Sequence, residues 1–199
     1  MKNSVLLVVD VQNDFCPGGK LAVAGGDLVV PLINHMARDF AHVILTQDWH
    51  PEGHSSFASQ HVGAATFTQI EMPYGVQTLW PDHCIIGSEG AKFHSALDLP
   101  QAELIIRKGF RRTIDSYSAF FENDHKTPTG LGGYLKERGL ERITMVGLAF
   151  DYCVRYSAED ARNLGFEVEV IEAATRAIDL NGSAEATKKS FVKHGISLS

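Results

Sequence analysis

Residues 4–10 read SVLLVVD, an apolar run that ends in a carboxylate. Similar runs recur along the chain: HVILTQ leads into Asp48, ELIIRK ends in Lys108, and RITMVG leads to Cys153. Apolar runs separated by helical patterns predict repeated βαβ units around a parallel sheet. The carboxyl ends of such strands form one edge, where small ligands bind. An acid, a metal site, an amine and a thiol are therefore expected in one cleft.

The expected fold class is α/β, a three-layer α/β/α sandwich with a mainly parallel central sheet. With 199 residues, 44% of them hydrophobic, the chain is long enough to bury a core, and residues 1–199 are expected to form a single domain. After the first strand, apolar residues at helical spacing predict a crossover helix opened by Asp27 as its N-cap. Further patterns predict a weak helix near 88–97, helices at 129–139, 152–163 and 183–193, and a strand at 166–171.

Composition restricts the partners. The formal net charge is −6 and Lys and Arg do not cluster, which argues against binding to nucleic acid. The apolar run before Asp10 has only five residues, too few for a signal peptide or a membrane span, so no membrane and a cytoplasmic location are expected. Cys16, Cys84 and Cys153 have no regular spacing and are expected to be reduced. The pattern leaves the oligomeric state open, a homo-oligomer included.

Cys153 is the candidate nucleophile. A thiol in the first turn of a helix faces unpaired N–H groups and the positive end of the helix dipole, which favour the thiolate and could hold an oxyanion. The alternative is a small buried residue that packs the helix on the sheet. Asp10 and Lys108 at equivalent strand ends favour the catalytic interpretation: buried Asp10 suits a proton acceptor, and Lys108 needs an anionic partner. Together they suit acyl transfer through a thioester.

Asp48 and His50 form an Asp-x-His pair whose side chains would point to one side of an extended segment. His54 and His83 follow. Two nitrogens and one oxygen suit zinc or iron(II), with water in the open positions. Spacing alone does not establish that His83 joins the pair.

Five segments, in order along most of the chain, resemble the nicotinamidases, also called pyrazinamidases, of the isochorismatase-like cysteine hydrolases. They are DVQNDFCPGGKLAV, DWHPEGHSSF, LWPDHC, RKG with DSYSAF, and GLAFDYCV. The resemblance implies the isochorismatase-like hydrolase fold and hydrolysis of nicotinamide to nicotinate and ammonia, a step in NAD recycling. Activity towards pyrazinamide is expected as well.

Carried over by position, the resemblance implies a role for each of several residues. These are Asp10, Lys108 and Cys153 as catalytic triad; Asp48, His50 and His83 as metal ligands; Ala149 and Cys153 as oxyanion hole; and Phe15, Trp80 and Tyr117 as substrate pocket. It also implies a cis peptide between Leu148 and Ala149. One divalent metal ion is expected, zinc first, with iron(II) or manganese(II) as alternatives. His54 stays outside this set, and Phe150 departs from the small polar residue common in related sequences.

Three other interpretations stay open. A metal-bound water could attack the amide while Cys153 only packs. The chain could be a non-catalytic small-molecule or metal-binding domain. It could also be a related amidase acting on another carboxamide or on a carbamoyl or ureido substrate. The DWH and WPDHC segments favour a nicotinamidase over that rival.

Overall fold

The computed structural model describes residues 3–199. Its centre is a six-stranded sheet in the order β5-β2-β1-β6-β7-β8, in which every neighbouring pair is parallel. The strands are β1 (Ser4–Val9), β2 (Val43–Asp48), β5 (Leu104–Lys108), β6 (Arg142–Leu148), β7 (Glu167–Arg176) and β8 (Ser197–Leu198). The predicted α/β class with a mainly parallel sheet is confirmed.

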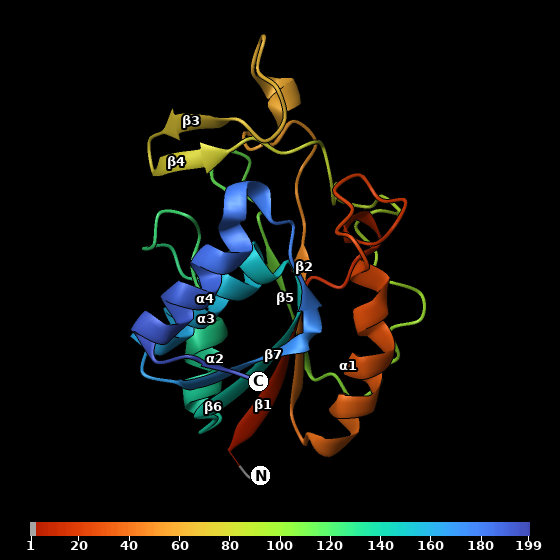
Figure 1. Cartoon of the computed structure of the whole chain (residues 1–199), viewed down its shortest axis with the longest axis vertical. Coiled ribbons are helices and arrows are strands. Elements are labelled where there is room, and N and C mark those ends of the chain that lie inside the picture. Colours follow the sequence, from red (N-terminus) through yellow and green to blue (C-terminus); the bar gives the residue numbers. More distant parts are fainter. Residues whose placement is uncertain (1–2) are drawn as a thin grey trace.

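Helices cover both faces of this sheet, which gives three layers (Figure 1). One face carries α1 (Val30–Met36), and the other carries α2 (Leu131–Glu137), α3 (Arg155–Asn163) and α4 (Ser183–His194). Single 3₁₀ turns span Asn13–Phe15, Gly26–Val29, Ala37–Asp39, Ala58–Gln60 and Leu180–Gly182, and a π-helical turn spans Phe150–Val154.

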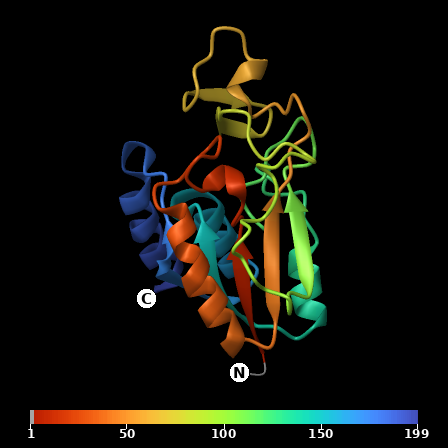
Figure 2. The same ribbon diagram turned by 90° about the vertical axis from the view of Figure 1, so that its right-hand side faces the viewer.

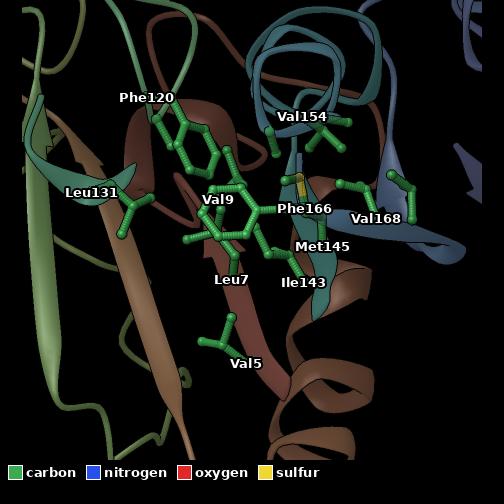
Figure 3. Packing of buried hydrophobic residues seen from close by; sticks show 14 of the residues in the cluster. Val5, Leu7, Val9, Phe120, Leu131, Ile143, Met145, Val154, Phe166 and Val168 are labelled. Atoms are coloured by element: carbon green, nitrogen blue, oxygen red, sulfur yellow. The ribbon is translucent and has the colours of Figure 1, made fainter. Parts of the chain in front are cut away.

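The central strand β1 is buried on both faces because side chains alternate along a strand. Val5, Leu7 and Val9 pack with α2, α3 and α4 in one apolar cluster (Figure 3). Leu6 and Val8 pack with α1 in the other. This two-sided burial explains the uninterrupted apolar run, and each fully buried side chain contributes roughly 1.5–3 kcal/mol.

The first crossover helix differs from its prediction at its start. Asp27 lies inside the 3₁₀ turn and makes no side-chain capping bond, and the N-cap of α1 is Val29. Pro31 in the first turn has a fixed φ that suits the start of a helix and lacks the N–H that would need a cap. The prediction that Asp27 is the N-cap of this helix was therefore wrong.

The long segment between β2 and β5 contains a hairpin that the sequence patterns did not predict. It pairs β3 (Gln69–Met72) with β4 (Gly75–Thr78) and stands beyond the carboxyl ends of the sheet strands (Figures 1 and 2). The weak helix predicted near 88–97 was wrong. The main chain of that stretch instead hydrogen-bonds to the loop after β1: Asp14 N donates to Gly90 O, and His94 N donates to Val11 O.

The remaining predicted helices correspond to α2, α3 and α4, with α3 preceded by the π-helical turn. The strand predicted at 166–171 extends as far as Arg176 in β7. Among residues 3–199, no helix combines the length and the apolar character needed to cross a membrane.

Candidate active site

Four chemically active side chains lie at the carboxyl ends of the neighbouring strands β5, β2, β1 and β6. Lys108 and Asp48 end β5 and β2, Asp10 follows β1, and Cys153 lies in the π-helical turn after β6. All are buried, with exposed fractions between 0% for Asp10 and 8% for Cys153. The parallel register pairs Asp48 directly with Lys108. The sheet thus gathers residues that are far apart in the chain.

Lys108 is the centre of this group. Its Nζ lies 2.7 Å from Asp10 Oδ2 and 2.9 Å from Asp48 Oδ1. The same nitrogen donates to Ser116 O at 3.1 Å and lies 3.4 Å from Cys153 Sγ. One buried ammonium therefore forms ion pairs with two carboxylates and borders the thiol.

Burial and charge act in opposite directions on these groups. Burial alone lowers the pKa of Lys108, but the adjacent carboxylates of Asp10 and Asp48 raise it well above its usual value. Burial raises the pKa of Asp10, although Lys108 opposes that effect. Lys108 is thus charged, and Asp10 is a stronger base than an ordinary aspartate.

Burial also raises the pKa of Cys153 well above that of a free thiol, with Lys108 again opposing. The sequence-based expectation that the helix start favours the thiolate does not hold for this resting arrangement, because desolvation is the larger effect. The nearby carboxylate of Asp10 raises the pKa of the thiol further. Cys153 is therefore a neutral thiol that already faces a base.

Asp48, His50 and His83 form a compact group of potential metal ligands. Asp48 Oδ2 lies 2.9 Å from His50 Nε2 and 3.1 Å from His83 Nε2. His83, which spacing alone could not place, is thus brought to the Asp-x-His pair. The other oxygen of Asp48 contacts Lys108, so one carboxylate joins the metal group to the thiol group.

The histidine hydrogen bonds fit a metal ion. His50 Nδ1 donates to Gly109 O at 2.9 Å, and His83 Nδ1 donates to Pro81 O at 2.8 Å. A carbonyl can only accept, so each ring donates through Nδ1, and Nε2, the nitrogen that faces Asp48, is the one that could ligate a metal ion. A histidine that ligates a metal through one ring nitrogen typically donates a hydrogen bond from the other. The donor set suits a divalent ion such as zinc.

His54 lies beside this group, with its ring centroid 4.4 Å from that of His50, but its nitrogens are engaged elsewhere. Nε2 donates to Arg111 O at 2.9 Å and Ile114 O at 3.1 Å, and Nδ1 accepts from Ser56. His54 therefore supports the ring of His50 and the loop around Ile114. Its ring nitrogens nevertheless lie close enough to His50 and Asp115 for the three residues to form a second group of potential metal ligands.

A cavity opens next to these residues. Its wall includes Phe15, Trp80 and Tyr117, the three residues expected in a substrate pocket, together with Asp48, His50, His83, Lys108 and Cys153. Tyr117 Oη accepts hydrogen bonds from Trp80 Nε1 at 3.1 Å and from Gln77 Nε2 at 2.8 Å. An aromatic cavity of this kind suits a flat ring.

The segment that carries Cys153 also lines the cavity through Ala149. The peptide between Leu148 and Ala149 is cis, as the resemblance implied. Phe150 lies outside the cavity wall in the apolar core, with its ring 5.6 Å from that of Phe191 in α4. Phe150 thus packs beneath the site.

Several residues of the site escaped sequence reasoning. Tyr152 lines the cavity with its ring 4.8 Å from that of Trp80, and Asp115 lines it with Oδ1 3.9 Å from His50 Nε2. Gln12 holds the main chain of Asp48 through two hydrogen bonds of 2.8 Å. Gln12 and Asp115 lie in two of the segments that carry the family resemblance. Their signal in the sequence is weak, because each is a polar residue without a distinctive spacing.

Comparison with known proteins agrees with this geometry. The family model described as the isochorismatase domain matches residues 4–196. A nicotinamidase of Acinetobacter baylyi is 53% identical over 194 residues, which cover 98% of this chain and 91% of the relative.

Three solved structures superpose closely. An Acinetobacter baumanii nicotinamidase and pyrazinamidase has a TM-score of 0.99 at 54% identity, with 100% of this chain and 96% of the other covered. PnC1 from L. infantum, in complex with nicotinate, has a TM-score of 0.87 at 37% identity, with 100% of this chain and 92% of the other covered. The pyrazinamidase of Pyrococcus horikoshii, in complex with zinc, has a TM-score of 0.81 at 33% identity, with 99% of this chain and 98% of the other covered. With its parallel sheet, its lysine in contact with both an acid and a thiol, and a family match over nearly its whole length, this chain belongs to the isochorismatase family.

Proposed function

We propose that this protein is a nicotinamidase, which hydrolyses nicotinamide to nicotinate and ammonia and so serves NAD salvage. The observation that carries the proposal is the position of Lys108. Its ammonium contacts Asp10, Cys153 and Asp48, so the thiol and the metal group border one aromatic cavity. That arrangement suits a planar aromatic amide whose ring nitrogen and carboxamide need different partners. The relative and the structural neighbours named nicotinamidase support the choice of substrate.

In the proposed reaction Asp10 takes the proton of the Cys153 thiol, and the thiolate attacks the amide carbon. The N–H groups of Ala149 and Cys153 hold the tetrahedral oxyanion. Asp10 returns the proton to the departing nitrogen, and ammonia leaves a thioester behind. Asp10 then takes a proton from water, which attacks the thioester to release nicotinate and restore the thiol.

Lys108 opposes the effect of burial on the pKa of Asp10 and balances the negative charge that develops at sulfur. Phe15, Trp80 and Tyr117 enclose the ring. Asp48, His50 and His83 would hold a divalent metal, which supplies a Lewis acid for the ring nitrogen and so orients the substrate. We propose zinc as this metal, a choice supported by the zinc complex of the P. horikoshii neighbour.

Pyrazinamide is a second expected substrate, because its ring keeps a nitrogen at the same position relative to the carboxamide. The neighbour named as both nicotinamidase and pyrazinamidase supports this extension. A cytoplasmic location remains part of the proposal, on the sequence grounds given above.

The deciding experiment is ammonia release from nicotinamide by the purified protein, with and without prior iodoacetamide treatment. Metal content is measured on the same samples. Loss of activity on alkylation with the metal retained supports the thioester route. Activity that persists after alkylation of Cys153 would indicate that a metal-bound water, and not Cys153, attacks the amide. No ammonia from untreated, metal-loaded protein would refute the proposed substrate.

A further inference from the structure

Thr46 lies in the middle of β2 and is fully buried, with an exposed fraction of 0%. Its hydroxyl makes two hydrogen bonds to one residue of the neighbouring strand end. Oγ1 donates to Asp10 Oδ1 at 2.6 Å and accepts from the main-chain N–H of Asp10 at 3.1 Å. The direction of these bonds is determined, because a hydroxyl has a single proton and the N–H already acts as donor. That proton therefore points at the carboxylate.

The two oxygens of Asp10 consequently have different surroundings. Oδ1 is held by Thr46, whereas Oδ2 lies 2.7 Å from the Lys108 ammonium. With both oxygens held, rotation of the carboxylate about its last side-chain bond is restricted. Asp10 has a positive φ of 48°, a conformation that L side chains rarely adopt, and its N–H also bonds Thr46. One hydroxyl thus constrains both the main chain and the side chain of Asp10.

We propose that Thr46 is a positioning residue for the general base, and that its hydroxyl fixes the carboxylate of Asp10 in the orientation needed for proton transfer with Cys153. The assignment of Asp10 as base rests on the proposed function, but the orientation of its carboxylate does not. Proton transfer in catalysis requires the base within hydrogen-bond reach of the proton, so a rotated carboxylate slows the chemical step. Binding of the ring involves other residues and is left intact.

Two substitutions separate the hydroxyl from the rest of the side chain. Thr46→Val keeps the branched shape and removes the hydroxyl, whereas Thr46→Ser keeps the hydroxyl and removes the methyl group. Thr46→Val is expected to lower kcat for nicotinamide by about 10- to 100-fold with KM changed less than about threefold. Thr46→Ser is expected to stay within about threefold of the wild type in both constants.

Thr187→Val is the matched control. Thr187 is also fully buried, and its hydroxyl donates to Ser183 O at 2.8 Å within α4. It should leave kcat and KM within about twofold of the wild type while losing comparable stability. A loss of kcat in Thr46→Ser as large as that in Thr46→Val would overturn the proposal, as would an unchanged kcat in Thr46→Val. If Thr46→Val does not fold, Thr46→Ala replaces it in the comparison with Thr46→Ser, with the same expected order.

Crystal structures of the variants test the inference independently of the substrate. In Thr46→Val the Asp10 carboxylate should rotate away from its wild-type orientation, and in Thr46→Ser it should keep it. An unchanged carboxylate in Thr46→Val refutes the positioning role even if the wild type hydrolyses nicotinamide. A wild type that releases no ammonia from nicotinamide refutes the proposed function, and in that case the rotation alone decides the role of Thr46.

Discussion

Replacing Gly109 by alanine should weaken metal binding although no ligand residue is substituted. A Cβ at this position would lie 2.4 Å from Cε1 and 2.7 Å from Nδ1 of His50. Ordinary contacts between carbon atoms are about 3.5–4.0 Å, so the ring must move by about 1 Å. That movement breaks the 2.9 Å bond from His50 Nδ1 to Gly109 O and exceeds the roughly 0.2 Å tolerance of a metal–ligand distance.

The expected loss is about 10- to 100-fold in metal affinity, the range typical for loss of an outer hydrogen bond to a ligating histidine. The assay is competition for zinc between the protein and a chromophoric chelator. Gly109 has a φ of +69°, so alanine also adds backbone strain of about 1–2 kcal/mol.

Gly139→Ala separates the two effects. Gly139 has nearly the same φ, +66°, but a Cβ there would meet nothing within 4 Å. It should lose stability through strain alone and keep wild-type metal affinity. If Gly109→Ala binds zinc as tightly as Gly139→Ala, the assignment of His50 as a ligand oriented by Gly109 is refuted.

Three further outcomes test other parts of the site. Cys153→Ala should lower ammonia release by at least about 10³-fold with metal content unchanged, and normal turnover in it would refute the thioester route. Lys108→Met leaves the buried carboxylate of Asp10 without its counter-charge and removes one partner of Asp48, and it should reduce the free energy of unfolding in urea by about 3–5 kcal/mol. Arg155→Met, which breaks a partly exposed pair with Glu159, should reduce it by less than about 1 kcal/mol, and equal losses in the two variants would contradict the role given to Lys108. His83→Ala should abolish stoichiometric zinc binding, whereas His54→Ala should retain one zinc per chain with affinity reduced by no more than about tenfold, and the reverse order would identify His54 as the ligand.

The sheet could be predicted because its signal is local. A central strand covered on both faces needs an uninterrupted apolar run, and SVLLVV and RITMVG have it. The same reasoning placed Asp10, Lys108 and Cys153 at one edge without any structure, since parallel strands bring their carboxyl ends together. The hairpin of β3 and β4 was not predicted, although the Pro73-Tyr74-Gly75 turn between short alternating runs is a local signal for it.

The segment between Asp48 and Lys108 could not be read in this way, because distant partners determine its conformation. The stretch around Gly90 bonds the main chain of Asp14, and Asp14 Oδ2 in turn accepts from Cys84 N at 2.7 Å, directly after His83. Neither contact leaves a period or a spacing in the sequence. For this reason the weak helix near 88–97 was predicted wrongly and the place of His83 stayed open.

The α/β fold, the order along the chain of the strands that carry polar ends, and the residue types available for chemistry follow from the amino-acid sequence alone, because they depend on hydrophobic periodicity and on neighbours in the chain. The pairing of those residues, in contrast, follows only from the folded arrangement of the strands. The ammonium of Lys108 reaches Asp10, Asp48 and Cys153 together. Nε2 of His54 faces main-chain carbonyls and its Nδ1 faces Ser56, and burial keeps Cys153 protonated. Such pairings depend on distance and desolvation between strands that folding brings together, and no local pattern encodes them.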